Sequence, residues 1–597
     1  MKRILALLIC VMLFLSLVGC TEPTTDSAQD LTNDETEHAE VENKFQPGTY
    51  TVEVMGHNGR FSIDVTFDEN SIVDIVVGEN NESGFIGDVA IKDMTSKILK
   101  RQSLDVDTIS GATVTGAVVR SGVAKAVAEA GGNVDDFMIP EEPDTTVWED
   151  TTADVVVVGS GAAGLAATIQ AEELGMQVIL VEQLGLIGGS SVRAGYMVGG
   201  DTIVQKNAGI DFSVQDWVDI MVKPRDTTDI GLYQEASSLR MARNAGKNID
   251  WLYELGVEFG PVNLEWQHYG PEGARVGPFA INAFQRALDE RGIDYRLNTR
   301  ATKILMEDGV VKGITVEAPN GSNYNIYANA VILATGGFFA NKEMVEKYDP
   351  EHAQFPTDVC IGADGSGMLM AEEVGAVLKY MDQANYHGLA AMWNGASRSL
   401  SLPAGNGAIA VNKYGKRYAN EAGAYELLTK GTMSQEDGLV FTIMDQTIMD
   451  LDVIKNDHGL SNIIEMYEVA DTVEELATKL GIDPEGLRET IDNYGSYVRN
   501  GEDLEFGKDP AYMRSDFSTG PYYGVKSIVE NHTNHGGIVV DIDNHVLNAD
   551  NEIIPGLFAA GECAASHIQG WYTYQACIEN GRVSAKVAFE EMNNLQQ

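Results

Sequence analysis

The sequence predicts an α/β protein whose main body is a Rossmann-like domain, with a smaller α+β module before it. Three observations support this class. A buried β-branched run at residues 154–158 leads into a glycine-rich turn and then a helical pattern. Within residues 45–132, three strand-like alternations precede an Ala/Val-rich helical pattern. Hydrophobic residues make up 44% of the 597 residues, which suits several folded cores rather than one.

The composition excludes several classes of partner and site. Acidic side chains number 89 against 41 basic ones, a formal charge of −48. Such a surface repels nucleic acid and anionic lipid headgroups, so neither is expected as a specific partner. The five cysteines lack metal-ligand spacing and form no Cys-x-x-Cys-His motif. We therefore expect no metal, no covalent haem and no disulfide framework.

The N-terminus has the pattern of an export signal. Lys2 and Arg3 precede a short apolar run, which ends in Gly19-Cys20 and resembles a bacterial lipobox. This predicts a lipoprotein signal peptide at 1–20, lipidation of Cys20 and a flexible, polar tether at 21–44. The protein is then expected on the extracytoplasmic face of the bacterial cell membrane, held by its lipid anchor only. The alternatives are an ordinary signal peptide and a buried helix.

The first module, residues 45–132, reads as a strand meander followed by a helix. Alternating patterns predict strands at 48–54, 61–67 and 72–77, and a helix is predicted at 114–130. Asp107-Thr108-Ile109-Ser110-Gly111-Ala112-Thr113 stands directly before that helix. A phosphate is stabilised at a helix N-terminus, where this turn would leave the last Thr hydroxyl accessible.

These residues resemble the FMN-binding domain of respiratory flavoproteins, which attach FMN through a phosphoester bond to the last Thr of this motif. The resemblance implies covalent FMN on Thr113, and a separate flavin transferase as the maturation partner. The alternative is that Ser110 and Thr113 only cap the helix.

After a linker at 133–152, the main domain opens with a dinucleotide-binding pattern. The strand at 154–158, the turn Gly159-Ser160-Gly161-Ala162-Ala163-Gly164, a helix to Leu174 and a second strand at 178–181 follow in order. The strand ends at Glu182, about 20 residues on, where an acid accepts the adenosine ribose hydroxyl.

Three further segments resemble the fumarate reductase and succinate dehydrogenase flavoprotein family, in its soluble fumarate reductase and urocanate reductase branch. They are Gly188-Gly189-Ser190-Ser191 with Gly195, the run Val331–Phe338, and the run Ile554–Glu562. The resemblance covers about residues 152–590. It implies an FAD domain at 153–379 and 534–597, with an α+β capping and substrate domain inserted at 380–533. It also implies non-covalent FAD, bound by Gly159, Gly161, Ala162, Ala163, Gly164, Glu182, Gly188, Gly189, Ser190, Ser191, Gly195, Ala334, Thr335, Gly336, Gly337, Asp364 and Glu562.

The active-site positions of that family are changed in this chain. The register set by Gly405–Glu421 puts Tyr425 at the position of the proton-donor Arg and Leu400-Ser401 at the position of a Thr-Glu pair. Of two substrate histidines, one falls on Asn385, with His387 two residues on, and the other is kept as His532. A last Arg has no counterpart between Glu562 and Gly581, so we expect fumarate to lose its charged partners and bind poorly.

The residues at these changed positions favour a flatter substrate and a tyrosine phenol as the proton donor. Aromatic side chains that would line the pocket are Tyr386, Trp393, Tyr425, Trp571, Tyr572 and Tyr574. The expected catalytic residues are Tyr425 and His532, with Tyr425 as the proton donor, a role similar to that of Tyr in 3-ketosteroid dehydrogenases. The expected substrate-binding residues are Asn385, His387, Ser401, His567, Trp571 and Tyr572.

Together these features predict a flavin-dependent oxidoreductase of anaerobic respiration acting on a CH–CH group. It would reduce an activated C=C bond in a small-molecule alkene: an enoate, an aryl acrylate such as urocanate or cinnamate, or an enone. Electrons would pass from a membrane donor through FMN to FAD. The alternatives are a fumarate reductase proper, a ketone or ketosteroid-type dehydrogenase, and a non-enzymatic electron-transfer flavoprotein.

Overall fold

The computed structural model describes residues 44–221, 235–457, 461–565 and 573–595. The predicted signal peptide with Cys20 lies outside these residues, as does the predicted tether except for Lys44. Within the described ranges, no helix has both the length and the apolar character needed to cross a bilayer.

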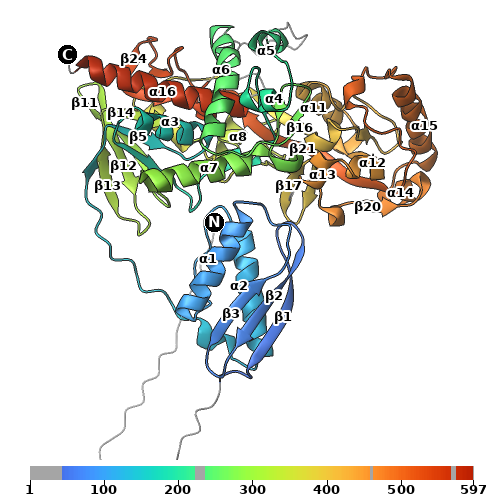
Figure 1. The fold of residues 1–597 in the computed structure, drawn as a ribbon, viewed down its shortest axis with the longest axis horizontal. Coiled ribbons are helices and arrows are strands. Elements are labelled where there is room, and N and C mark those ends of the chain that lie inside the picture. The colour runs from blue at the N-terminus through green and yellow to red at the C-terminus, as the bar shows by residue number, and fades with distance from the viewer. Residues whose placement is uncertain (1–43, 222–234, 458–460, 566–572, 596–597) are drawn as a thin grey trace, which may run out of the picture. The chain divides into compact units, whose positions relative to one another are not determined.

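A small α+β module comes first along the chain (Figure 1). Its elements are β1 (Gly48–Met55), β2 (Arg60–Phe67), β3 (Ile72–Val77), α1 (Gly87–Arg101) and α2 (Thr113–Glu129). The strands form an antiparallel sheet in the order β1-β2-β3, which confirms the three predicted strands and the predicted helix. Helix α2 approaches β2 closely at Gly122, where a Cβ would lie 2.6 Å from Cδ1 of Ile63. Residues 138–150, which follow this module, form neither helix nor strand.

The main body is built on a six-stranded sheet in the order β10-β6-β5-β14-β24-β23. The strands are β5 (Val155–Val158), β6 (Val178–Val181), β10 (Asp294–Arg296), β14 (Ala330–Leu333), β23 (His545–Leu547) and β24 (Ile553–Ala559). Neighbouring strands are parallel, except that β23 runs antiparallel to β24. Every residue of β5 is buried, as expected of a strand covered on both faces. This confirms the predicted α/β class with a Rossmann-like core.

Helices and smaller sheets surround this sheet. Helix α3 (Ala162–Glu173) packs against α16 (Thr573–Leu595), the red helix of Figure 1. A second sheet has the order β11-β12-β13-β4 and a third the order β7-β9-β8. The other elements are β4 (Thr151–Thr152), η2 (Gly189–Arg193), β7 (Met197–Val198), α4 (Ile203–Asn207), α5 (Val214–Met221), α6 (Glu235–Glu254), β8 (Val262–Asn263), β9 (Gln267–His268), α7 (Val276–Arg291), β11 (Arg300–Glu307), β12 (Val310–Glu317), β13 (Asn323–Tyr327), α8 (Lys342–Tyr348), α9 (Ser366–Glu373), β15 (Leu378–Lys379) and β22 (Gly537–Ile538).

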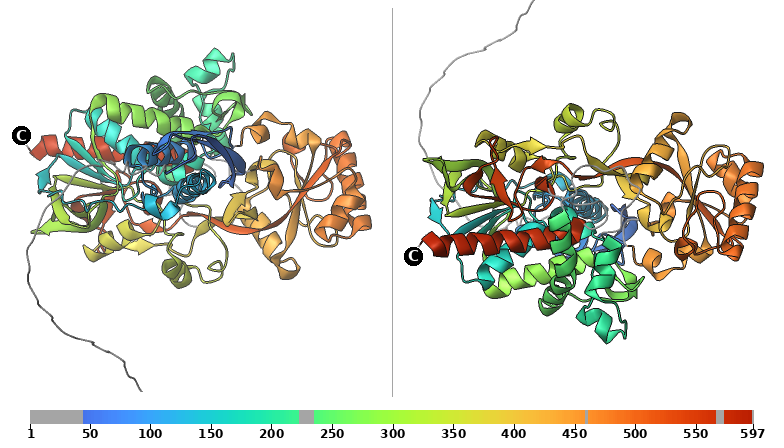
Figure 2. Two further views of the ribbon diagram at one scale, coloured as in Figure 1. Left: turned by 90° about the horizontal axis from the view of Figure 1, so that it is seen from below. Right: turned by 90° about the horizontal axis from the view of Figure 1, so that it is seen from above.

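Residues 384–534 build a sheet of their own, in the order β17-β16-β21-β19-β18. The elements are β16 (Ala384–Trp393), β17 (Ala396–Ser399), α10 (Ser401–Ala404), β18 (Ile409–Val411), α11 (Tyr425–Met433), β19 (Val440–Asp445), α12 (Gln446–Met449), α13 (Asp452–Lys455), β20 (Glu468–Ala470), α14 (Val473–Leu480), α15 (Pro484–Asn500) and β21 (Tyr522–Asn534). Helices α14 and α15, orange in Figure 2, pack together, and α14 also contacts β20 and β21. In the pairing of β16 with β21, His387 stands opposite Glu530.

Candidate flavin and substrate site

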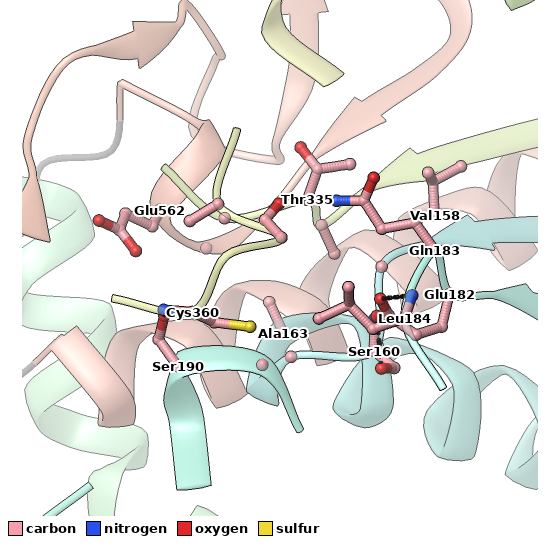
Figure 3. Close-up of a pocket in the computed structure, with 18 of the residues that line it drawn as sticks. Val158, Ser160, Ala163, Glu182, Gln183, Leu184, Ser190, Thr335, Cys360 and Glu562 are labelled. Atoms are coloured by element: carbon pink, nitrogen blue, oxygen red, sulfur yellow. Dashed lines mark hydrogen bonds between the residues drawn. The ribbon is translucent and has the colours of Figure 1, made fainter. Parts of the chain in front are cut away.

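A long cavity lies where the parallel strands β5, β6, β14 and β24 end (Figure 3). This edge is where open α/β sheets bind their ligands. The cavity has an empty volume of ≈ 790 Å³, within the usual range of pockets that bind small molecules and cofactors. The predicted cofactor residues that line it are Gly159, Gly161, Ala162, Ala163, Glu182, Gly189, Ser190, Ser191, Ala334, Thr335, Gly336 and Glu562.

Five predicted cofactor residues are absent from the described lining: Gly164, Gly188, Gly195, Gly337 and Asp364. Gly164 has a packing role, since a Cβ there would lie 1.8 Å from the carbonyl oxygen of Gly159. Asp364 accepts a hydrogen bond of 2.8 Å from Arg300, which does line the cavity. Sequence reasoning missed Arg300, because it precedes no glycine motif.

The glycine turn fits a bound pyrophosphate. Gly159 has φ +98°, and a Cβ there would lie 2.5 Å from the carbonyl oxygen of Ala334, so only glycine is tolerated. Gly161 caps α3, and a Cβ there would meet nothing nearer than the Ser191 hydroxyl at 3.7 Å. The N-terminus of α3 is therefore approachable by an anion, although the Ala162 N–H itself donates to Ser191 Oγ at 2.9 Å.

Glu182 lies at the opposite end of this cavity from Glu562 (Figure 3). Burial raises its pKa, while hydrogen bonds from Ser160 and Leu184 act against that rise. Its carboxylate accepts the Ser160 hydroxyl at 2.6 Å and the backbone amides of Ser160 and Leu184 at 2.9 and 2.8 Å. The carboxylate is thus held in a fixed orientation at the end of the cavity where the adenosine ribose is expected.

A second cavity, with an empty volume of ≈ 1770 Å³, adjoins the first. Ser190, Ser191, Glu562 and Cys577 line both. This space is large enough for a flavin ring and an aromatic substrate together. Of the predicted active-site residues, those lining it are His387, Ser401, Tyr425 and His532.

The other predicted substrate residues are not placed in this cavity. Asn385 lies on β16 opposite Thr533 and is not among the described lining residues. His567, Trp571 and Tyr572 fall within 566–572, outside the described residues.

Two histidines form a stacked pair in the second cavity. The rings of His387 and His532 lie 3.8 Å apart between centroids. His532 Nδ1 lies 3.0 Å from the Asp358 carboxylate, which raises the pKa of His532 against the opposing effect of burial. His387 Nδ1 lies 2.8 Å from Glu530, yet burial, aided by His532, lowers the pKa of His387. The pair therefore combines a more basic ring with a less basic one.

Tyr425 is the first residue of α11, and its ring meets that of His387 edge-on at 5.1 Å between centroids. The Ser401 hydroxyl forms a hydrogen bond with the phenol. Burial raises the pKa of Tyr425, and the Ser401 hydrogen bond and the Arg275 charge reduce that rise. The phenol is thus neutral at physiological pH, as a proton donor must be.

A buried ionic cluster anchors the segment that leads to Tyr425. Arg417 donates hydrogen bonds to Glu421 at 2.9 Å and to Asp503 at 3.0 Å, and Lys508 Nζ lies 3.4 Å from Glu421. The side chains of Arg417, Glu421 and Lys508 are fully buried. Burial alone would raise the pKa of Glu421, but Lys508 and Arg417 hold that pKa below its ordinary value. The cluster joins two distant stretches of the inserted domain beside the second cavity.

The second cavity is more cationic than the sequence led us to expect. Arg193, Arg275 and Arg514 line it, although none occupies an arginine position of the family register. Arg275 pairs with the buried Asp457 and donates to the carbonyl of Arg193 at 2.9 Å. Arg193 lies two residues after the segment Gly188–Ser191, and this closeness was the signal that could have identified it. Guanidinium groups are thus present, supplied by segments other than the two family positions that lack arginine in this chain, and poor binding of fumarate stays a prediction.

The aromatic lining also differs from the prediction. Tyr425 and Tyr574 line the second cavity, but Tyr386 and Trp393 do not appear in the described lining. Tyr386 instead bonds to Asp349 at 2.6 Å and stacks on His352. The reason is strand geometry: His387 faces the cavity, so its neighbour on β16 faces the other way. The aromatic residues that sequence reasoning missed are Tyr196, Tyr269 and Tyr512.

The FMN motif forms the turn before α2. Gly111 has φ +96°, and Thr113 opens the helix with an exposed side chain whose hydroxyl lies 3.4 Å from the Ile109 carbonyl. An exposed hydroxyl at a helix N-terminus fits attachment of a flavin phosphate. The Ser110 carbonyl accepts a 3.3 Å hydrogen bond from the Gly185 amide, near the glycine segment of the main body.

Comparison with known proteins agrees with this geometry. A family model described as FAD binding domain matches residues 154–577, and one described as FMN-binding domain matches residues 56–128. The chain is 29% identical over 589 residues to an NADH:acrylate oxidoreductase of Vibrio harveyi, covering 87% of this chain and 58% of that protein. It therefore spans little more than half the length of that relative.

Two further matches extend over most of both proteins. The chain is 30% identical over 549 residues to a urocanate reductase of Eggerthella lenta, covering 87% of this chain and 88% of that protein. The open conformation of a flavocytochrome c3 fumarate reductase matches with a TM-score of 0.61 and 28% identity, covering 76% of this chain and 83% of that one. The chain therefore belongs to the FAD-binding family of fumarate reductase and succinate dehydrogenase flavoproteins, with an FMN-binding domain before the FAD-binding domain.

Proposed function

We propose that this protein is a flavin-dependent reductase of an activated carbon–carbon double bond, and that its substrate is an enoate or an aryl acrylate such as urocanate or cinnamate. One observation carries the proposal: Tyr425, the stacked histidines and Arg275 meet in a cavity that shares lining residues with the FAD-type cavity. The residues that line the first cavity would hold FAD, which when bound would supply hydride-transfer chemistry.

The chain's own residues supply the rest of the chemistry. Tyr425 protonates the second alkene carbon, because its raised pKa keeps the phenol protonated until negative charge develops beside it. Arg275 stabilises the phenolate that remains, since its charge acts on Tyr425.

The arginines favour a substrate with a carboxylate over an enone. Arg275, Arg514 and a protonated His532 would bind the carboxylate, and Tyr196, Tyr269 and Tyr512 offer aromatic surface to the rest of the substrate. The same guanidinium groups favour fumarate reduction as the second candidate, because a dicarboxylate needs two cationic partners.

The proposed electron route begins at the membrane. Thr113 would hold FMN after attachment by a flavin transferase, and a membrane donor would supply the electrons. The FMN-domain match and the exposed Thr113 hydroxyl support this route. The lipobox-like ending at Cys20 supports an extracytoplasmic, lipid-anchored location.

The test uses the flavinylated protein, reduced without oxygen by a viologen and then mixed with cinnamate, urocanate, fumarate or cinnamate methyl ester. We expect the free acids to reoxidise the flavin about 10–100-fold faster than the ester, which cannot accept charged hydrogen bonds equally well. If no compound reoxidises the flavin, the proposal is wrong. Equal rates for acid and ester would remove the assigned role of the arginines.

A pair of variants tests whether the Arg275 guanidinium binds the substrate carboxylate. Arg275→Lys keeps a charge beside Asp457 but loses the planar fork, so KM for cinnamate should rise about tenfold or more. The matched control is Arg291→Lys, at the surface ion pair with Glu172, which should leave KM unchanged.

A further inference from the structure

The guanidinium group of Arg275 is held in place from the inserted domain. Its backbone belongs to the FAD-binding body, where Arg275 is the N-cap residue of α7 and the next amide, that of Val276, donates to the Gly195 carbonyl at 3.1 Å. Its side chain, however, donates from Nε to the carboxylate of Asp457, which follows α13 in the inserted domain. One part of the protein therefore fixes the backbone of this arginine, and the other contacts its charged group.

Asp457 is itself firmly anchored in the inserted domain. Its side chain is fully buried, and its second oxygen accepts the backbone N–H of Ser461 at 3.0 Å and the Ser461 hydroxyl. The neighbouring Asn456 donates to the Glu272 carbonyl at 2.6 Å, and α13 packs on the body turn η3 (Pro271–Gly273) that contains Glu272. These contacts fix the carboxylate, so it determines the orientation of the guanidinium that it binds.

The donors of Arg275 are divided between the protein and the cavity. A guanidinium has five N–H groups. One is used on Asp457 and one on the Arg193 carbonyl at 2.9 Å, so among the residues that the structure describes three remain for a ligand. Burial would lower the pKa of Arg275, but the charge of Asp457 raises that pKa above its ordinary value. The group therefore stays cationic where it lines the second cavity, close enough to act on Tyr425.

We propose that Asp457 is a positioning residue for anion recognition, which holds the Arg275 guanidinium in the orientation that binds the substrate carboxylate. The inference rests on the proposed function, in which Arg275 binds that carboxylate. Asp457 is not among the described lining of the second cavity, so it acts through Arg275. The alternative is that this buried ion pair only holds the body and the inserted domain together.

The two roles differ in how they depend on the charge of the ligand. Asp457→Asn keeps the size of the side chain and removes the charge that orients Arg275. A positioning role predicts that the Kd for cinnamate rises about 3–10-fold, the usual cost of ordering one long side chain on binding, while the Kd for cinnamate methyl ester is unchanged. A purely structural role predicts equal changes for both compounds. Titration of the oxidised, flavinylated protein, followed by flavin absorbance, measures both Kd values without turnover.

The matched control is Asp445→Asn, at another buried aspartate of the inserted domain. Asp445 likewise accepts a serine hydroxyl, that of Ser515 at 2.7 Å, and a backbone N–H, that of Ile448 at 3.2 Å, but in the described part of the chain it pairs with no arginine. Its acid-to-ester ratio of Kd values should equal that of wild type. If Asp457→Asn does not fold, Ser461→Ala removes one bond to Asp457 and should weaken cinnamate binding about 2–5-fold while sparing the ester.

Three results would overturn the positioning role. The first is an unchanged or lower Kd for cinnamate in the variant that folds, and the second is an equal loss of affinity for acid and ester. The third is a wild type that binds acid and ester equally, which also removes the role of Arg275 in the proposed function. A wild type that prefers the acid, together with an Asp457→Asn variant that keeps this preference, refutes the role of Asp457 alone.

Discussion

The replacement of Tyr425 by Phe is the most direct test of the active site. The change removes one hydroxyl and keeps the ring, which meets His387 edge-on at 5.1 Å between centroids. The hydrogen bond with Ser401 is lost, at a cost of about 0.5–1.5 kcal/mol in the free energy of unfolding. The fold should therefore survive, and any large effect belongs to the chemistry.

The expected kinetic effect is a slower oxidative half-reaction. A positioned general acid contributes about 10²–10⁴-fold, or roughly 3–5 kcal/mol of activation free energy. Because burial raises the pKa of the phenol, wild-type activity should not decline through Tyr425 ionisation below about pH 10. Stopped-flow reoxidation of the pre-reduced protein by cinnamate measures both points.

Two results would refute this assignment. The first is reoxidation of Tyr425→Phe at more than half the wild-type rate. The second is an equal loss in the control Tyr418→Phe, whose hydroxyl bonds to Thr432 at 2.9 Å and is not among the described cavity lining.

Three further predictions concern the buried charges and the cofactor. Glu421→Ala leaves Arg417 and Lys508 buried without that partner, so the free energy of unfolding, measured in guanidinium, should fall by about 3–5 kcal/mol. The control Glu489→Ala, at an exposed ion pair, should lower it by at most about 1 kcal/mol. Burial raises the pKa of Glu562 to about 7, so the folded state binds this proton more tightly than the unfolded chain does. Wild-type stability should then fall by about 1–3 kcal/mol between pH 5 and pH 8, and this part of the change should vanish in Glu562→Gln, as urea unfolding at both pH values would show. Thr113→Ala should lose the flavin that stays attached after acid precipitation while retaining FAD, and a variant that still holds covalent FMN would contradict the attachment site.

Local patterns in the sequence were enough to predict the strands and the glycine turn. β5 and the turn at Gly159 follow from consecutive residues, because burial on both faces and the close approach to Ala334 constrain each position separately. Helix α1 was missed. Its buried Ala90, Met94 and Ile98 recur every four residues, but its N-cap residue, Ile86, forms no side-chain cap hydrogen bond to mark the start.

The charged residues that line the second cavity could be identified only from the tertiary structure. Arg193 ends η2, Arg275 precedes α7 and Arg514 lies in the inserted domain, so nothing local connects them. Alignment with a family predicts site residues only at positions where the family has an equivalent residue. The outward position of Tyr386, by contrast, was predictable, because neighbouring strand residues face opposite sides and His387 was already assigned to the site.

The second cavity draws its residues from two parts of the chain, and this limits how its selectivity can be transplanted. Tyr425, His387 and Ser401 belong to the inserted domain, whereas Arg193 and Arg275 belong to the FAD-binding body. A chimera that exchanged only the inserted domain with a relative would move the acid and its hydrogen-bond partners but leave these two guanidinium groups behind. Such a hybrid would divide anion recognition between the two proteins, because Arg275 would stay with the body while Arg514 and His532 would move with the inserted domain.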